Sequence, residues 1–300
     1  MSGTSFRMSG LVKSYRDFTL GPLDLEVEPG SVIALVGPNG SGKTTTMHCL
    51  LGLVLPDGGE IEIAGRSNRS GDVSWKQEVG FVGEVQGYYK RWTVRENFDF
   101  LRRFYPRWDD RRVADLSRRF GLQLGKKVNE LSKGNRRKMA LVAALAYEPK
   151  VLLFDEPTSG LDPVVRAEVL DVLWEILEEG DASILYSTHV LSDISRLAYE
   201  LVFLRDGKIL GRHDKEDLLA SWRRVTFRHG GDLPKMPEVF SSRVAGRDHQ
   251  IVTSDFETTA QALGDLGAEN VHANRMTVEE ISVEVLRQEH VVEAGRAATG

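Results

Sequence analysis

A glycine-rich segment, Gly37–Thr44 (GPNGSGKT), has the residue types and spacing that bind a nucleoside triphosphate. It fits the pattern G-x-x-x-x-G-K-[ST], follows the apolar run at 32–36 and opens a helical stretch that reaches Leu51, which is the context the pattern requires. Glycines let the backbone curl until successive N–H groups point inward around phosphates, and the following helix N-terminus adds its dipole. The segment therefore predicts a phosphate-binding loop.

The motif predicts a specific role for two residues of this loop. Lys43 reaches the β- and γ-phosphates of ATP, and the Thr44 hydroxyl is placed to ligate Mg²⁺. The residues predicted to surround the nucleotide here are Gly37, Pro38, Asn39, Gly40, Ser41, Gly42, Lys43, Thr44 and Thr45. The loop predicts a nucleoside-triphosphate site, but it does not indicate which process the hydrolysis of that nucleotide drives.

Two adjacent carboxylates, Asp155 and Glu156, follow the apolar run 151–154. A buried strand would deliver Asp155 to its carboxyl end, beside Mg²⁺. Glu156, one residue further, is available to polarise a water molecule for attack on the γ-phosphate. Acidic residues can simply end a strand, but together with a phosphate loop the pair favours catalysis.

The elements that must position these residues alternate between strands and helices, which predicts an α/β domain. Strands are expected at 23–27, 32–36, 60–64, 151–154, 183–187 and 201–204, and helices at 131–147 and 163–177.

A helical region follows Thr93, which with Glu96 has capping-box spacing. Its apolar face is expected to hold Val94, Phe98, Leu101 and Tyr105, with Pro106 stopping the helix and Asp109 capping the next, through Phe120.

Four further motifs, in order, complete a resemblance to the ABC ATPases over about 5–219. Leu131–Asn135 (LSKGN) resembles the family's signature sequence, Ser159–Asp162 its D-loop and Ser187–His189 its switch histidine segment. Tyr15 lies upstream of the phosphate loop, where the family stacks an aromatic ring on adenine, although packing alone would also explain this tyrosine.

The resemblance implies a P-loop NTPase fold and a shared site. Two cassettes would dimerise head to tail around two ATP molecules, as a homodimer or with a second ABC cassette. Ser132, Gly134 and Asn135 of one subunit, with Asp162, would then face the phosphate loop of the other. His189 would hold the γ-phosphate and the attacking water.

Two segments depart from the family pattern. An ungapped alignment of the 79–83 segment places Glu84 where most members have the Q-loop glutamine, with Gln86 as the alternative. A carboxylate can ligate Mg²⁺ but cannot donate a hydrogen bond. In the signature, Lys133 replaces a glycine and Asn135 replaces a glutamine.

The net charge and the hydropathy of the chain limit the classes of partner it is expected to bind. The net charge of −5 argues against nucleic-acid binding, and we find neither a long apolar span nor a secretory signal. A single cysteine, Cys49, excludes an internal disulfide. A cytoplasmic protein, peripheral to the membrane, is expected. Residues 85–138 carry sixteen Lys or Arg and six Asp or Glu, which indicates either solvated helix faces or a basic lobe facing lipid or an acidic partner.

The segments 104–109, 131–135 and 276–281 resemble the branch that serves drug- and bacitracin-type exporters with a separate permease. We therefore expect an ATP-hydrolysing exporter subunit, with the cassette at 1–221, its helical subdomain at about 85–138, a small α+β domain at 222–290 and a flexible tail at 291–300. A soluble ABC ATPase with a non-membrane partner, or a weakly hydrolysing switch subunit, is the alternative.

Overall fold

A computed structural model describes residues 4–83, 87–179, 182–188, 197–236 and 238–287. The chain divides into two compact units, residues 1–198 with 204–210, and residues 199–203 with 211–300. Within the described residues no helix is both long and apolar enough to span a bilayer.

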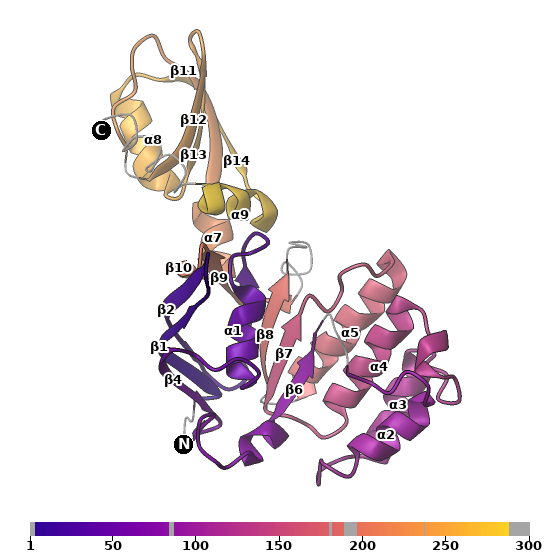
Figure 1. Cartoon of the computed structure of the whole chain (residues 1–300). Helices are drawn as coiled ribbons and strands as arrows, with labels where there is room; N and C mark the ends of the chain where they lie inside the picture. The colour runs from indigo at the N-terminus through magenta and orange to yellow at the C-terminus, as the bar shows by residue number, and fades with distance from the viewer. Residues whose placement is uncertain (1–3, 84–86, 180–181, 189–196, 237, 288–300) are drawn as a thin grey trace. The chain divides into compact units, whose positions relative to one another are not determined.

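The central sheet has the strand order β10-β9-β3-β8-β7-β6 (Figure 1). Strands β3, β8, β7 and β6 pair in parallel, and every residue of β3 and β7 is buried, as expected for strands covered on both faces. The strands are β3 (Val32–Val36), β6 (Val79–Val82), β7 (Val151–Asp155), β8 (Ser183–Thr188), β9 (Glu200–Arg205) and β10 (Lys208–Asp214).

A second, antiparallel sheet has the order β2-β1-β4-β5. In β2 alternate residues are buried, including Leu23, Leu25 and Val27, which matches the predicted period of two. Its strands are β1 (Phe6–Ser14), β2 (Thr19–Val27), β4 (Gly58–Ile63) and β5 (Arg66–Ser67). Helix α1 (Lys43–Leu50) lies between this sheet and strands β6 to β8 in Figure 1, and it contacts β7.

A helical lobe lies beside the central sheet (Figure 1). The predicted caps form: Thr93 and Glu96 exchange capping-box hydrogen bonds, and Asp109 accepts from the N–H groups of Arg111 and Arg112. The elements of the lobe are α2 (Val94–Leu101), α3 (Asp110–Arg119), η2 (Val128–Glu130) and α4 (Lys133–Leu145), whereas η1 (Ser74–Glu78) precedes β6 and α5 (Pro163–Glu179) follows β7.

The prediction that Tyr105 continues the face of α2 is wrong. The N–H groups of Arg103 and Phe104 bond to carbonyls three residues back, so the helix tightens into a turn and ends at Leu101. Tyr105 instead stacks on Tyr147, with ring centroids 3.9 Å apart.

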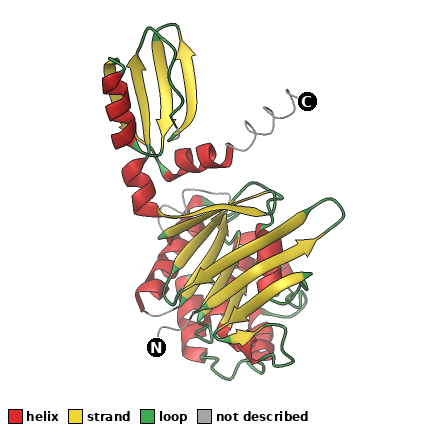
Figure 2. Cartoon of the chain, turned by 90° about the vertical axis from the view of Figure 1, so that its left-hand side faces the viewer, coloured by secondary structure: helices red, strands yellow, loops and turns green. Residues whose placement is uncertain are grey.

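The C-terminal domain contains a four-stranded antiparallel sheet in the order β12-β13-β11-β14, with α8 on one face (Figure 2). Its core is Val225, Phe227, Ile251 and Leu263. The elements are α7 (Lys215–Ser221), β11 (Arg223–Arg228), β12 (Val239–Ala245), β13 (Asp248–Thr253), α8 (Phe256–Asp265), β14 (Glu269–Arg275) and α9 (Val278–Arg287). The domain limits proposed from the sequence remain a prediction.

Candidate functional site

The phosphate loop joins β3 to α1 in a conformation that requires glycine. Gly40 and Gly42 have φ values of 81° and 110°, in the left-handed region that side chains disfavour. Gly37 has no room for a side chain, because a Cβ there would lie 2.1 Å from the carbonyl oxygen of Leu204. Local packing and backbone curvature therefore both fix the glycine spacing seen in the sequence.

Lys43 begins α1 and is buried, with 6% of its surface exposed. Its ammonium donates to the carbonyl oxygens of Gly37 and Pro38, at 2.8 and 3.1 Å. Burial lowers the pKa of this amine, while the nearby Glu156 and Asp155 carboxylates act in the opposite direction. A buried cation held by neutral carbonyls gains most from an anionic partner such as a phosphate.

Asp155 at the end of β7 is held on both carboxylate oxygens. The hydroxyl of Thr44 donates to Oδ2 at 2.8 Å, and that of Ser187, from β8, donates to Oδ1 at 2.5 Å. Parallel pairing of β7 and β8 puts Asp155 opposite Ser187, so the sheet register creates this contact. Thr44 and Asp155 together supply the hard oxygen donors that Mg²⁺ prefers.

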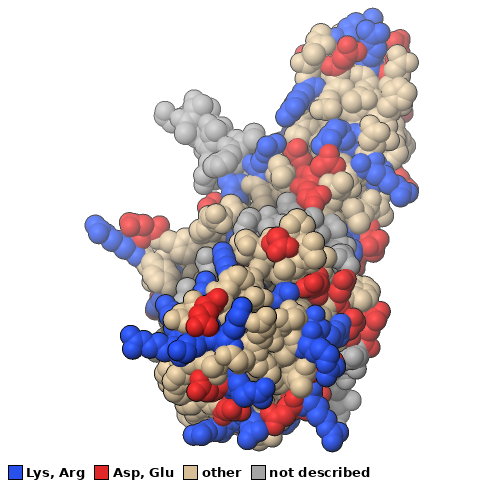
Figure 3. All heavy atoms as spheres, turned by 90° about the vertical axis from the view of Figure 1, so that its right-hand side faces the viewer, with Lys and Arg blue, Asp and Glu red and all other residues tan. Residues whose placement is uncertain are grey.

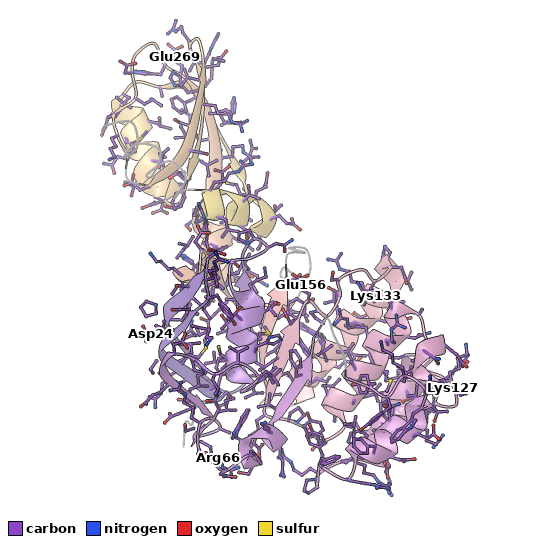
Figure 4. The ribbon with its side chains drawn as sticks, viewed as in Figure 1. Asp24, Arg66, Lys127, Lys133, Glu156 and Glu269 are labelled. Carbon is purple, nitrogen blue, oxygen red and sulfur yellow. The ribbon has the colours of Figure 1, made fainter. Side chains whose placement is uncertain are left out.

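Glu156 follows β7 and has a φ of 53°, an unusual value for a residue with a side chain. Its N–H donates to the carbonyl of Ser187 at 3.1 Å. Such backbone strain occurs preferentially at functional sites. In Figure 4, Glu156 lies at the carboxyl end of β7, the edge of the sheet from which α/β proteins bind ligands.

The phosphate loop, Glu156 and Tyr15 line one pocket of about 640 Å³. Tyr15 is 47% exposed, and its ring stacks on that of Phe18 with centroids 6.5 Å apart. The lining residues are Tyr15, Phe18, Asn39, Gly40, Gly42, Lys43, Thr44, Thr45, Glu156 and Ser159. The exposed ring of Tyr15 and the partly buried ring of Phe18 line the same pocket as cationic, hydroxyl and carboxylate groups, a combination that suits a purine and a triphosphate.

The signature residues do not line this pocket. Ser132 is the exposed N-cap of α4 and accepts a hydrogen bond from the Asn135 N–H at 3.2 Å. Asp162 similarly accepts from the N–H groups of Val164 and Val165, both at 3.1 Å. The helix start leaves backbone N–H groups available for an anion.

The signature and the D-loop are neighbours within the chain. A Cβ on Gly160 would lie 2.8 Å from Lys133 Nζ, and one on Gly134 would lie 3.6 Å from Leu161 Cδ2. The lysine that replaces a family glycine thus covers the D-loop rather than the phosphate loop, and Figure 4 places Lys133 apart from Glu156.

Three predicted positions, Glu84, Gln86 and His189, lie outside the described residues. Two contributors were missed from the sequence. Phe18 lies with Tyr15 in the turn between β1 and β2, where no periodicity marks it, and the Ser187 contact with Asp155 depends on strand register.

Comparison with known proteins agrees with this geometry. A family model described as ABC transporter matches residues 20–159. The bacitracin transport ATP-binding protein BcrA of Bacillus licheniformis is 31% identical over 69% of this chain and 69% of its own length. The sulfate/thiosulfate import ATP-binding protein CysA of Synechocystis is 36% identical over 68% of this chain and 59% of its own.

A solved structure described as the ATP-binding subunit of an ABC transporter superimposes with a TM-score of 0.66 and 28% identity. It covers 72% of this chain and 92% of that chain, which confirms the expected fold class. The motifs in order, the matching fold and a relative spanning more than two thirds of both chains lead to one conclusion: the protein belongs to the ATP-binding subunits of the ABC transporter family.

Proposed function

We propose that this chain binds and hydrolyses ATP to drive a separate membrane permease for export. The observation that carries the catalytic part is the meeting of Lys43, Thr44 and Glu156 in one pocket, with Asp155 hydrogen-bonded to Thr44. Lys43 binds the phosphates, Glu156 accepts a proton from the attacking water and His189 orients that water.

Thr44 and Asp155 are the described residues that would hold Mg²⁺, with Glu84 as a further proposed ligand. Within the described residues no cluster of three His, Cys, Asp or Glu could bind a metal ion by itself. Magnesium typically has few protein ligands and takes others from water and substrate phosphates, so this sparse donor set fits it. When bound, the ion neutralises charge on the phosphoryl group that is transferred.

The two half-sites support a head-to-tail dimer. The pocket is lined by one set of motifs, while Ser132, Gly134 and Asn135 lie elsewhere, at the start of α4. A second copy that presents its own α4 N-terminus would supply the anion donors that the pocket needs. ATP binding then closes the dimer, and hydrolysis opens it.

The permease surface is proposed on the helical lobe, where aromatic rings lie exposed. Tyr89 stacks on Trp92 with centroids 4.3 Å apart, and Phe100 contacts both and also Phe104. Tyr89, Trp92 and Phe104 are 48%, 38% and 58% exposed. Exposed aromatic clusters of this kind are typical of the centres of protein interfaces.

The charge of the lobe is less one-sided than its sequence suggests. Figure 3 shows acidic side chains among the basic ones on this side of the molecule. Three arginines of the lobe form ion pairs with glutamates outside residues 85–138: Arg107 with Glu78, Arg112 with Glu148 and Arg119 with Glu175. This pairing favours an aromatic permease contact over broad attraction to lipid.

The relatives include both a bacitracin transport protein and a sulfate importer subunit, so they do not decide the direction of transport. Export is therefore proposed from the branch resemblance alone. The same resemblance supports a location at the cytoplasmic face of the membrane, bound through the permease. The neighbouring gene offers a direct check: a polytopic membrane protein supports this proposal, and its absence favours a soluble partner.

Phosphate release by the purified chain with Mg-ATP tests the catalytic proposal. We expect steady turnover that stops when Mg²⁺ is chelated. Binding of ATP without release would instead favour the switch subunit that Glu84 and Lys133 suggest.

The permease contact is tested by Trp92→Ala with Phe104→Ala. Basal turnover should be retained while association with membranes from cells expressing the permease falls. The matched control, Leu55→Ala, removes an exposed apolar side chain outside the cluster. Unchanged fractionation of the double variant would exclude this surface.

A further inference from the structure

The start of α4, residues 133–138 (KGNRRK), carries four cations and no carboxylate. Positive side chains are unfavourable at a helix N-terminus, because the N–H groups there already give that end a partial positive charge. A sequence that served helix stability alone would place Asp or Glu in this turn. The four cations are therefore expected to have partners outside the turn.

Three of the four cations have such partners within the chain. Arg136 and Arg137 donate to backbone carbonyl oxygens, and Lys138 forms an ion pair with Glu168 at 2.8 Å. Lys133 differs from them: it is exposed, and within the described residues its ammonium forms neither a hydrogen bond nor an ion pair. Lys133 is thus the cation of this turn that is open to a partner outside the chain.

The side chain of Lys133 lies over the D-loop. A Cβ added at Gly160 would lie 2.8 Å from Lys133 Nζ and 3.4 Å from Cε, so glycine leaves the room that the lysine occupies. Asp162, a described carboxylate of the same loop, forms no ion pair with this lysine and accepts hydrogen bonds from the N–H groups of Val164 and Val165 instead. The D-loop therefore supports the lysine without neutralising it.

The neighbours of Lys133 indicate which anion it would meet. Ser132 and Gly134, on either side of it, belong to the segment that the proposed dimer turns towards the phosphates of a second copy. None of these three residues lines the ATP pocket of its own chain. An anion at the start of α4 would meet the helix N–H groups and the ammonium together.

We propose that Lys133 binds the terminal phosphate of ATP held by a second copy of this chain, so that closure of the dimer depends on a triphosphate. This inference rests on the proposed head-to-tail site. Lys43 holds the phosphates from one side of that site and Lys133 from the other. Without ATP the two lysines repel each other across the interface. ADP lacks the terminal phosphate and should not close the dimer.

Lys133→Met separates the charge of this residue from its packing. Methionine keeps an unbranched stem but removes the ammonium, so turnover should fall about tenfold or more. Binding of ATP to the monomer should be unchanged. Lys133→Arg keeps the charge and should retain most of the turnover. The matched control is Lys126→Met, which removes an exposed lysine elsewhere on the lobe and should have no effect.

A mixture of two inactive chains shows on which side Lys133 acts. Lys43→Ala lacks a working pocket and Ser132→Arg lacks a working signature, so their mixed dimer holds one intact site. The Ser132→Arg chain supplies its pocket and the Lys43→Ala chain supplies its signature. Lys133→Met on the Lys43→Ala chain should lower phosphate release by this mixture about tenfold. The same substitution on the Ser132→Arg chain should leave it unchanged, because that lysine faces the inactive pocket.

The alternatives give different results in this mixture. A loss caused by Lys133→Met on the Ser132→Arg chain, alone or equally with the other chain, would overturn the proposal, because Lys133 would then act through the D-loop of its own chain. No loss from either chain would show that Lys133 is a solvated surface charge. A mixture with native Lys133 in both chains that releases no phosphate would contradict the head-to-tail site itself, and this inference with it.

Discussion

The phosphate-loop side and the signature side of the cassette differ in how much of a site one chain completes. The loop, Glu156 and Tyr15 line a single pocket, and Asp155 is held between Thr44 and Ser187. Ser132 and Asp162 make local capping bonds at helix starts. The phosphate-loop side is an assembled pocket. The signature side consists of helix N-termini whose backbone N–H groups can bind an anionic ligand.

The difference arises from the elements that carry each side. Strands β3, β7 and β8 pair in parallel, so the segments after them meet at one edge of the sheet. The signature lies at the start of α4, and its glycine packs near Leu161 of the D-loop. A buried sheet thus positions the proposed catalytic residues within the chain, whereas the signature lies at the N-terminus of α4 and does not line their pocket.

The largest effect is expected for Glu156→Gln, on the phosphate-loop side, which should trap a dimer with ATP bound. Glu156→Gln keeps the shape of the pocket but removes the base, so turnover should fall on the order of a hundred- to ten-thousand-fold. ATP binding should persist and accumulate a dimer, visible by size-exclusion chromatography. The exposed Glu60→Gln should leave the rate unchanged. Turnover near the wild-type rate would show that Glu156 is not the base.

Ser132→Arg should also lower turnover, on the order of a hundredfold, because it blocks an anion-binding helix start. Unlike Glu156→Gln, it should not accumulate an ATP-trapped dimer, while ATP binding to the isolated chain is retained. The exposed Ser70→Arg is the control. If the Ser132→Arg variant still forms a closed dimer with ATP, the signature is not part of the ATP site.

Gly37→Ala tests the rigidity of the assembled side. The added Cβ would lie 2.1 Å from the Leu204 carbonyl oxygen, so the free energy of unfolding should fall by about 1–3 kcal/mol. Gly125→Ala, with no atom within 4 Å of its Cβ, should leave stability nearly unchanged. The denaturant midpoints of the two variants measure this difference. Equal midpoints would mean that the phosphate loop shifts to accommodate the added Cβ at no cost in stability.

Substitution of Glu84 should have the smallest effect. Glu84→Ala should lower Mg²⁺ affinity and blunt stimulation by the permease, because a carboxylate among Asp155, Glu156 and phosphates is tolerated when it ligates the metal. Glu84→Gln should be nearly neutral, since an amide oxygen has the same reach. Superimposable Mg²⁺ titrations of turnover would mean that Glu84 does not approach the ion.

Much of the fold followed from local patterns, while tertiary contacts did not. Buried strands such as β3 and the caps at Thr93 and Asp109 are encoded within a few residues, so periodicity and capping rules found them. Strand β14 was not predicted, because only Val271 and Ala273 are apolar in it, too short an alternation to indicate a strand, and all of its residues are exposed.

The site shows the same division. Lys43 and Thr44 were predicted from the phosphate-loop motif and Asp155 from the apolar run before it, and the structure brings Thr44 and Asp155 into contact. The ion pairs of the helical lobe cannot be predicted in this way: Arg107, Arg112 and Arg119 contact carboxylates that lie tens of residues away in the chain, so a charge count overstated the basic lobe. Packing between distant segments decides such contacts.

The central claim, that each complete site needs both sides from different copies, is tested by mixing two inactive variants. Lys43→Ala lacks the phosphate contact and Ser132→Arg lacks the signature contact. A mixed dimer contains one intact site, so the mixture should recover about a quarter of the wild-type rate, as random assortment makes half of the dimers mixed.

Replacing the Ser132→Arg partner by a chain with both substitutions removes the intact site and should abolish the recovery. Phosphate release from the two mixtures and from each variant alone is the deciding measurement. Recovery in the first mixture alone supports a site shared between copies. A first mixture no more active than its separate components would contradict it.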